Sequence, residues 1–74
     1  MTIKEAKRKA EESVKNEGLH ISSTVLDDGE YFIFGYTEEI DISPVAVNKH
    51  TGEIEDYFPP DHPNFLKAKE IILD

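Results

Sequence analysis

The stretch from Tyr31 to Tyr57 constrains the fold more than any other part of this 74-residue chain. It begins with an aromatic-rich run, Glu30 to Thr37, in which both faces of an extended strand would be apolar, as is typical of a central strand. A second extended run covers Pro44 to Val47, and a third covers Glu53 to Phe58. Gly52 lies between them and supplies the left-handed residue of a hairpin turn. The stretch therefore predicts antiparallel strands joined by tight connections.

The residues before this stretch predict a helix and a first strand. Thr2 and Glu5 have the spacing of a capping box, and small apolar residues then recur at helical spacing, which predicts a helix over residues 3–17. Residues 20–26 alternate and are rich in β-branched side chains, which favours a strand. Gly29 marks the turn into the aromatic strand, so these two strands should form a hairpin.

The residues after Phe58 predict a second helix. Asp61 is suited to be its N-cap, and Pro63 is tolerated in a first helical turn. Apolar residues then continue at helical spacing to the end of the chain: Phe65, Leu66, Ala68, Ile72 and Leu73. The connection Thr37–Ser43 is ambiguous, because its alternating apolar and acidic residues fit either a strand or a loop.

These elements predict a single α+β domain over residues 1–74. We expect an N-terminal helix, an antiparallel four-stranded meander sheet and a C-terminal helix, with both helices packed on one face of the sheet. Seventy-four residues leave room for one core, and the 38% hydrophobic fraction is sufficient to build it. The chain has no cysteine, export signal or apolar run that could span a bilayer, so the sequence favours a cytoplasmic protein that does not bind membranes.

The negative charge is concentrated in the middle of the chain. The net charge is −8, and residues 18–66 alone contain ten acids and one lysine, a net of −9. Such a surface repels nucleic acid and attracts a basic partner at long range. We therefore expect a basic protein partner and no direct contact with nucleic acid.

The sequence contains no recognisable catalytic or metal-binding motif. Its three histidines lack the local spacing of zinc ligands, and its serines lack a nucleophile elbow. Its carboxylates lie in turns or alternate outward, where they should ionise normally instead of acting as general acids. The sequence therefore predicts a non-enzymatic protein without a cofactor or a metal.

A partner-binding surface is the functional site that the sequence favours. Tyrosine among carboxylates is well suited to a basic partner, and acids that share one strand repel each other unless a partner neutralises them. The residues that this argument selects are Glu53, Glu55, Asp56, Tyr57, Tyr31, Glu38, Glu39 and Asp41. A monomer is favoured, because acids on an outer strand discourage sheet-to-sheet pairing, although the hairpin edges leave a homodimer open.

The aromatic strand followed by the residues PVAVNKHTGEI, Pro44 to Ile54, resembles the Imm35/YrhB-like immunity proteins. The same hairpin is also similar to one in PepSY-like domains. The resemblance covers about a third of the chain and rests on a turn that unrelated proteins also use. It implies a small bacterial domain that binds a toxin and contributes no catalytic residues. The tryptophan expected on the immunity family's aromatic strand is absent, and PepSY-like domains are generally exported, whereas this chain has no signal.

Three functional hypotheses follow. The first is an immunity-type or antitoxin-like protein that neutralises a basic partner, such as a nuclease toxin, through its acidic sheet. The second is a nucleic-acid mimic of phage or mobile-element origin, which requires acids spaced about 6–7 Å apart along the strands. The third is a small domain whose acidity serves only solubility.

Overall fold

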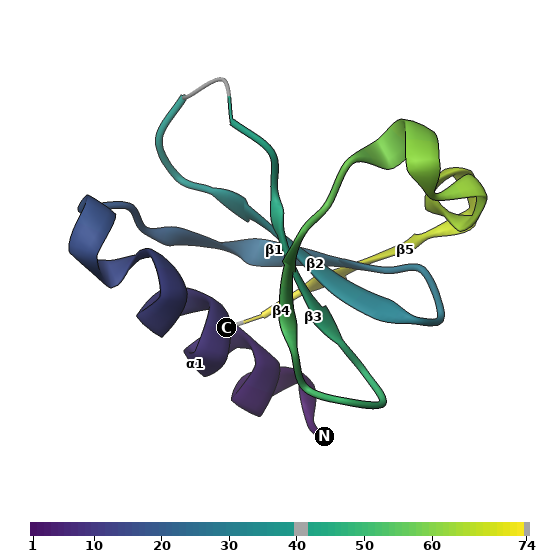
Figure 1. The fold of residues 1–74 in the computed structure, drawn as a ribbon, viewed down its shortest axis with the longest axis horizontal. Coiled ribbons are helices and arrows are strands. Elements are labelled where there is room, and N and C mark those ends of the chain that lie inside the picture. Colours follow the sequence, from purple (N-terminus) through teal and green to yellow (C-terminus); the bar gives the residue numbers. More distant parts are fainter. Residues whose placement is uncertain (40–41, 74) are drawn as a thin grey trace.

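A computed structural model describes residues 1–39 and 42–73, which form one α-helix and a five-stranded antiparallel sheet (Figure 1). The helix, α1, spans Ile3–Val14. The strands are β1 Ile21–Asp27, β2 Tyr31–Tyr36, β3 Val45–Asn48, β4 Ile54–Asp56 and β5 Lys69–Ile72. Their order across the sheet is β4-β3-β2-β1-β5, so the first four strands form the expected meander and β5 lies outside β1.

The N-terminal helix begins and ends as its capping residues predict. The Thr2 hydroxyl oxygen accepts a hydrogen bond from the backbone N–H of Glu5 at 3.2 Å, which satisfies one of the free donors of the first turn. After Val14 the chain tightens into a 3-10 turn over Lys15–Glu17, and Gly18 follows in the left-handed region with a φ of 72°. The predicted helix is confirmed, with its last three residues in the tighter form.

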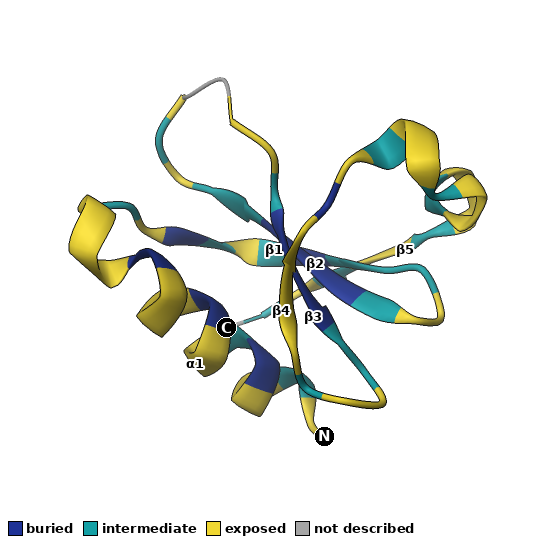
Figure 2. Cartoon of the chain, in the orientation of Figure 1, coloured by how far each residue is buried: buried dark blue, intermediate teal, exposed yellow. Residues whose placement is uncertain are grey.

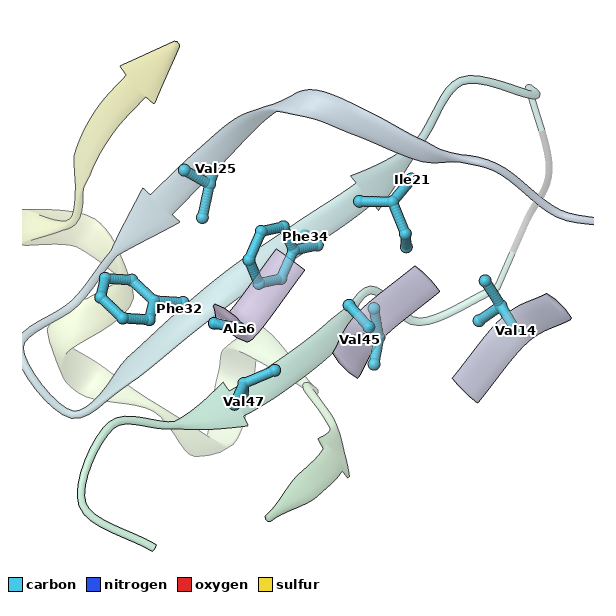
Figure 3. Packing of buried hydrophobic residues seen from close by; sticks show 9 residues of the cluster. Ala6, Val14, Ile21, Val25, Phe32, Phe34, Val45 and Val47 are labelled. Carbon is cyan, nitrogen blue, oxygen red and sulfur yellow. The ribbon is translucent and has the colours of Figure 1, made fainter. Parts of the chain in front are cut away.

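One face of the sheet packs against α1 and forms the larger of two apolar cores (Figure 3). The helix contributes Ala6, Ala10 and Val14, which are its buried residues. The strands contribute inward-facing side chains from β1, β2 and β3: Ile21, Val25, Phe32, Phe34, Val45 and Val47. Because alanine side chains are small, the helix can lie close to the sheet, and Phe34 retains no exposed surface.

The opposite face of the sheet carries a smaller core. Ile33 and Ala46 project away from α1 and are covered by Tyr57, while Phe65 packs at the margin. Ala46 is fully buried in this second core. Figure 2 shows the result in β2 and β3, which are buried along much of their length because both faces are covered.

Both tight turns of the meander place glycine in the left-handed region. Gly29 has a φ of 97° in the turn between β1 and β2, and Gly52 has a φ of 76° in the hairpin between β3 and β4. The side-chain oxygen of Asn48 accepts hydrogen bonds from two backbone N–H groups of the second turn. Both predicted turns are confirmed, although β4 covers only three residues of the longer strand that the sequence predicted.

The predicted C-terminal helix is wrong. Two short 3-10 turns, η2 Pro59–Asp61 and η3 Pro63–Lys67, lead instead into β5. The β-branched pair Ile71 and Ile72 favours a strand, and pairing with β1 satisfies backbone groups that would otherwise lie at the sheet edge. The described residues therefore contain five strands instead of four, and α1 is the only α-helix packed on the sheet.

A change of register interrupts the pairing between β1 and β2. Ile21 pairs with Tyr36 and Val25 with Phe34, so β1 has two more residues than β2 between these pairs. Gly35 is the β2 residue opposite this bulge. Apart from Gly35 itself and its two chain neighbours, no residue has a heavy atom within 4 Å of the position that a Cβ would occupy here.

Candidate functional site

The edge strand β4 carries three of the acids that the sequence singled out. Glu53 precedes β4, Glu55 and Asp56 lie on it, and all three residues are exposed. Among the described residues β3 is the only strand that pairs with β4, so its outer side is open. In the part of the chain that the structure describes, no lysine or arginine nitrogen lies within 4.0 Å of these carboxylates. We refer to Glu53, Glu55 and Asp56 as the acidic edge.

The carboxylates of the acidic edge are distributed to both sides of the sheet. Glu55 is opposite Ala46, on the side away from α1, and accepts a hydrogen bond from the Tyr31 hydroxyl at 3.4 Å. Burial raises the pKa of Tyr31, and the nearby charge of Glu55 raises it further, so the hydroxyl remains a donor at neutral pH. Asp56 is opposite Val45, on the α1 side. The acids therefore surround an edge of the sheet instead of covering one face.

Tyr57 does not lie on an uncovered face, because it is only 1% exposed. The ring of His62 stacks on it with centroids 4.1 Å apart, and Tyr31 meets the Tyr57 ring edge-on at 5.9 Å. The Tyr57 hydroxyl donates a hydrogen bond to Asp28 at 2.7 Å. This side chain belongs to the second core, while the half-buried Tyr31 is the tyrosine next to the acidic edge.

Asp28 is the polar anchor of the second core. One carboxylate oxygen accepts hydrogen bonds from the backbone N–H groups of Glu30 and Tyr31 at 2.8 and 2.7 Å, and the other accepts from Tyr57. Burial raises the pKa of Asp28, but the hydrogen bonds from Tyr57 and from the backbone outweigh this and hold the pKa below its ordinary value. Burial and the same carboxylate raise the pKa of Tyr57.

Glu38 and Glu39 follow the end of β2 and lie outside the strands. The Glu38 carboxylate is 2.7 Å from the ring Nδ1 of His20 and accepts a hydrogen bond from the His20 backbone N–H at 3.0 Å. These hydrogen bonds lower the pKa of Glu38 to about 2. Glu39 is exposed. The last acid that the sequence selected, Asp41, lies outside the described residues, as does part of the ambiguous segment Thr37–Ser43.

Three acids outside the acidic edge have side-chain partners within the chain. The ammonium of Lys49 lies 3.0 Å from both carboxylate oxygens of Asp27 and 5.0 Å from the centre of the Phe32 ring. Asp28 is held by the second core, and Glu38 is paired with His20. Asp27, Asp28 and Glu38 therefore have partners within the chain, whereas Glu55 is the member of the acidic edge that accepts a hydrogen bond, from Tyr31.

A groove of about 250 Å³ lies on the second face of the sheet. We call it the second-face groove. Its lining includes four apolar side chains, one glycine and one acid: Leu26, Ile33, Pro44, Phe65, Gly35 and Glu70. No sequence pattern described above predicts this groove. Gly35 was its only local signal, as a residue without a side chain in an otherwise aromatic and aliphatic strand.

The described residues contain no group of three or more histidine, cysteine, aspartate or glutamate side chains placed to hold a metal ion. No helix within residues 1–39 and 42–73 is long and apolar enough to cross a membrane. Comparisons with protein-family models, curated proteins and solved structures found no match for this chain.

Proposed function

We propose that this chain is a small protein-binding domain that recognises a basic protein through the acidic edge. One observation carries the proposal. The acidic edge gathers Glu53, Glu55 and Asp56 on and beside an open edge strand, with no lysine or arginine of the described residues in ion-pair range. Carboxylates on and beside one strand repel each other, and a cationic partner would lower this electrostatic cost.

The edge position supplies a second element of recognition. The outer side of β4 has backbone N–H and C=O groups without a strand neighbour among the described residues. An extended segment of a partner can pair with such an edge, and its side chains then alternate between the two sides of the sheet. Glu55 and Asp56 also project to these two sides, so basic residues at successive positions of an added strand would each meet a carboxylate.

This arrangement supports an immunity-type binding protein more than a nucleic-acid mimic. A mimic of the phosphate backbone needs a track of available acids across the surface. Asp27, Asp28 and Glu38 have partners within the chain, and Glu53, Glu55 and Asp56 surround one edge of the sheet instead of forming a track across a face. A basic nuclease toxin is the partner class that the resemblance to immunity proteins suggests.

The test compares charge reversal at the acidic edge with an equal reversal elsewhere. The double variant Glu53→Lys/Glu55→Lys changes the net charge as much as Glu11→Lys/Glu12→Lys, whose exposed residues lie on α1. We expect the wild type and the helix variant, immobilised at low salt, to capture the same basic protein from the native host, and the edge variant to lose it. Association with the purified partner should slow as salt rises, and the edge variant should flatten that dependence.

Two results would contradict the proposal. Equal loss of binding in both variants would show that only net charge matters, and an acidic captured protein would exclude the chemistry of the acidic edge. Thermal unfolding of both variants serves as the control for folding, since all four substituted residues are exposed.

A further inference from the structure

The second-face groove is a feature that the acidic edge does not explain. Figure 1 shows α1 and the η2–η3 segment on opposite sides of the sheet. The η2–η3 segment covers the second core where Phe65 packs, and the groove lies beside Phe65. Leu26 and Ile33 form part of its lining, and Pro44 belongs to the same surface. A pocket of this size with a mainly apolar lining can accept one large side chain.

Gly35 keeps the groove open. Glycine inside a strand is less stable than alanine there, so we looked for a role of Gly35 that offsets this loss of stability. The φ of Gly35 is outside the left-handed region, and no heavy atom lies within 4 Å of the position that a Cβ would occupy. Neither the backbone nor a close neighbour therefore requires glycine at this position. Any larger residue here would project a side chain into the groove that Ile33 and Leu26 line.

The polar groups of the groove indicate the charge of its occupant. Glu70 is the only charged residue in the lining, and Ser22 and Thr24 add hydroxyl groups. The residues around it belong to a chain with a net charge of −8, which disfavours a second copy as the occupant. The chemistry that fits is a large apolar side chain on a segment that carries lysine or arginine nearby.

We propose that the second-face groove binds a large apolar side chain of a basic peptide segment, with Glu70 pairing to a neighbouring cation of that segment. This inference rests on the proposed function in taking the partner to be basic, and it adds the side chain that anchors the partner. The acidic edge then increases the rate of encounter, whereas the groove slows dissociation, because buried apolar contacts are lost only when the complex separates.

The test uses isotope-labelled full chain and three synthetic pentapeptides with blocked ends. The first has a central tryptophan flanked by two lysines on each side, the second replaces tryptophan by serine, and the third replaces the lysines by glutamates. We expect saturable shifts of the backbone amides of Leu26, Ile33, Gly35 and Glu70 with the first peptide alone. The serine peptide should perturb only exposed acids, and the glutamate peptide should perturb neither.

Two variants sharpen the test. Gly35→Leu should weaken binding of the tryptophan peptide at least tenfold while leaving the melting temperature unchanged or higher, since its side chain fills empty space. Glu70→Gln, at an exposed residue, should weaken it severalfold and keeps the inference testable if Gly35→Leu folds poorly. Full affinity in a folded Gly35→Leu variant, or equal groove shifts with the serine peptide, would overturn the inference. Groove shifts that grow with protein concentration without any peptide would show that a second copy is the occupant and would also overturn it.

The edge variant Glu53→Lys/Glu55→Lys separates this inference from the proposed function. If its groove amides still respond to the tryptophan peptide while host-partner capture does not depend on the acidic edge, the groove stands and the proposed function fails. If capture depends on the acidic edge but the groove amides do not respond to the tryptophan peptide, the proposed function stands and the groove inference fails.

Discussion

The two faces of the sheet are covered by different means. On one face, α1 buries a regular stripe of small residues against inward-facing strand residues, and the buried members are all apolar. On the other face, two short 3-10 turns bring Phe65 and His62 over Tyr57, which is fixed by a hydrogen bond to Asp28. The first core depends on periodic packing, whereas the second depends on a few aromatic contacts and one carboxylate.

This difference explains why the groove lies on the second face. A helix covers adjacent strands continuously because its apolar side chains recur every turn. The short turns η2 and η3 cover only the part of the sheet near Tyr57 and Phe65, and the space beside Phe65 remains open. An incompletely covered face can serve as a binding site, because a partner that covers the exposed apolar lining removes it from water.

The largest effect is expected where the first core is disrupted. Phe34→Ala removes a fully buried ring beneath α1 and should lower the free energy of unfolding by about 3–5 kcal/mol. In a domain this small that loss approaches the whole stability, so circular dichroism should show an unfolded or marginal protein. Leu66→Ala is the control, because Leu66 is 92% exposed and its loss should change stability by less than about 0.5 kcal/mol. Similar urea midpoints for the two variants would contradict the assignment of this core.

A smaller but still large effect is expected at the anchor of the second core. Asp28→Ala removes the acceptor for two backbone N–H groups and leaves the buried Tyr57 hydroxyl without its partner. We expect a loss of about 2–3 kcal/mol in urea unfolding, since an unsatisfied buried group costs about 1–3 kcal/mol. Glu30→Ala, at an exposed residue of the same turn, is the matched control. If Asp28→Ala is no more harmful than this control, the carboxylate does not hold the second core.

The sequence predicts the elements of the first core well and those of the second core poorly. The reason is the separation in the sequence between the residues whose contacts define each feature. The capping of α1 by Thr2 and the glycine turns are local features, so a short window of sequence reveals them. The hydroxyl of the buried Tyr57 donates a hydrogen bond to Asp28, which lies 29 positions away in the sequence. No local sequence pattern indicates this contact. The residues from Phe65 to Ile72 fit helical spacing and strand preference alike, and pairing with β1 decides between them. The exposure of Glu55 and Asp56 follows from their position on an edge strand, whose neighbours the sequence identified correctly.

The contribution of the Tyr57 hydroxyl to the second core can be isolated. Tyr57→Phe preserves the stacked ring but removes the hydrogen bond to Asp28, and we expect a loss of about 1 kcal/mol at neutral pH. Without this donor the pKa of Asp28 should rise from its depressed value. A depressed pKa stabilises the fold above the ordinary value of 3.8 and loses that contribution as the pH falls. The variant should therefore lose less stability than the wild type on acidification, which urea titrations at several pH values measure. An identical pH dependence in both proteins would contradict the coupling.

The smallest effect at neutral pH is expected outside both cores, at Glu38. Its carboxylate links the segment after β2 to His20, the residue before β1, and the pKa of Glu38 is lowered from 4.5 to about 2. The stability that it contributes is fully present above pH 4.5 and is lost as the pH falls toward 2. Glu38→Gln should therefore flatten the acid dependence of stability in this window, whereas Glu39→Gln, at the exposed neighbour, should leave it unchanged. If Glu38→Gln kept the wild-type acid dependence, the contacts between Glu38 and His20 would not contribute to the acid sensitivity of the fold.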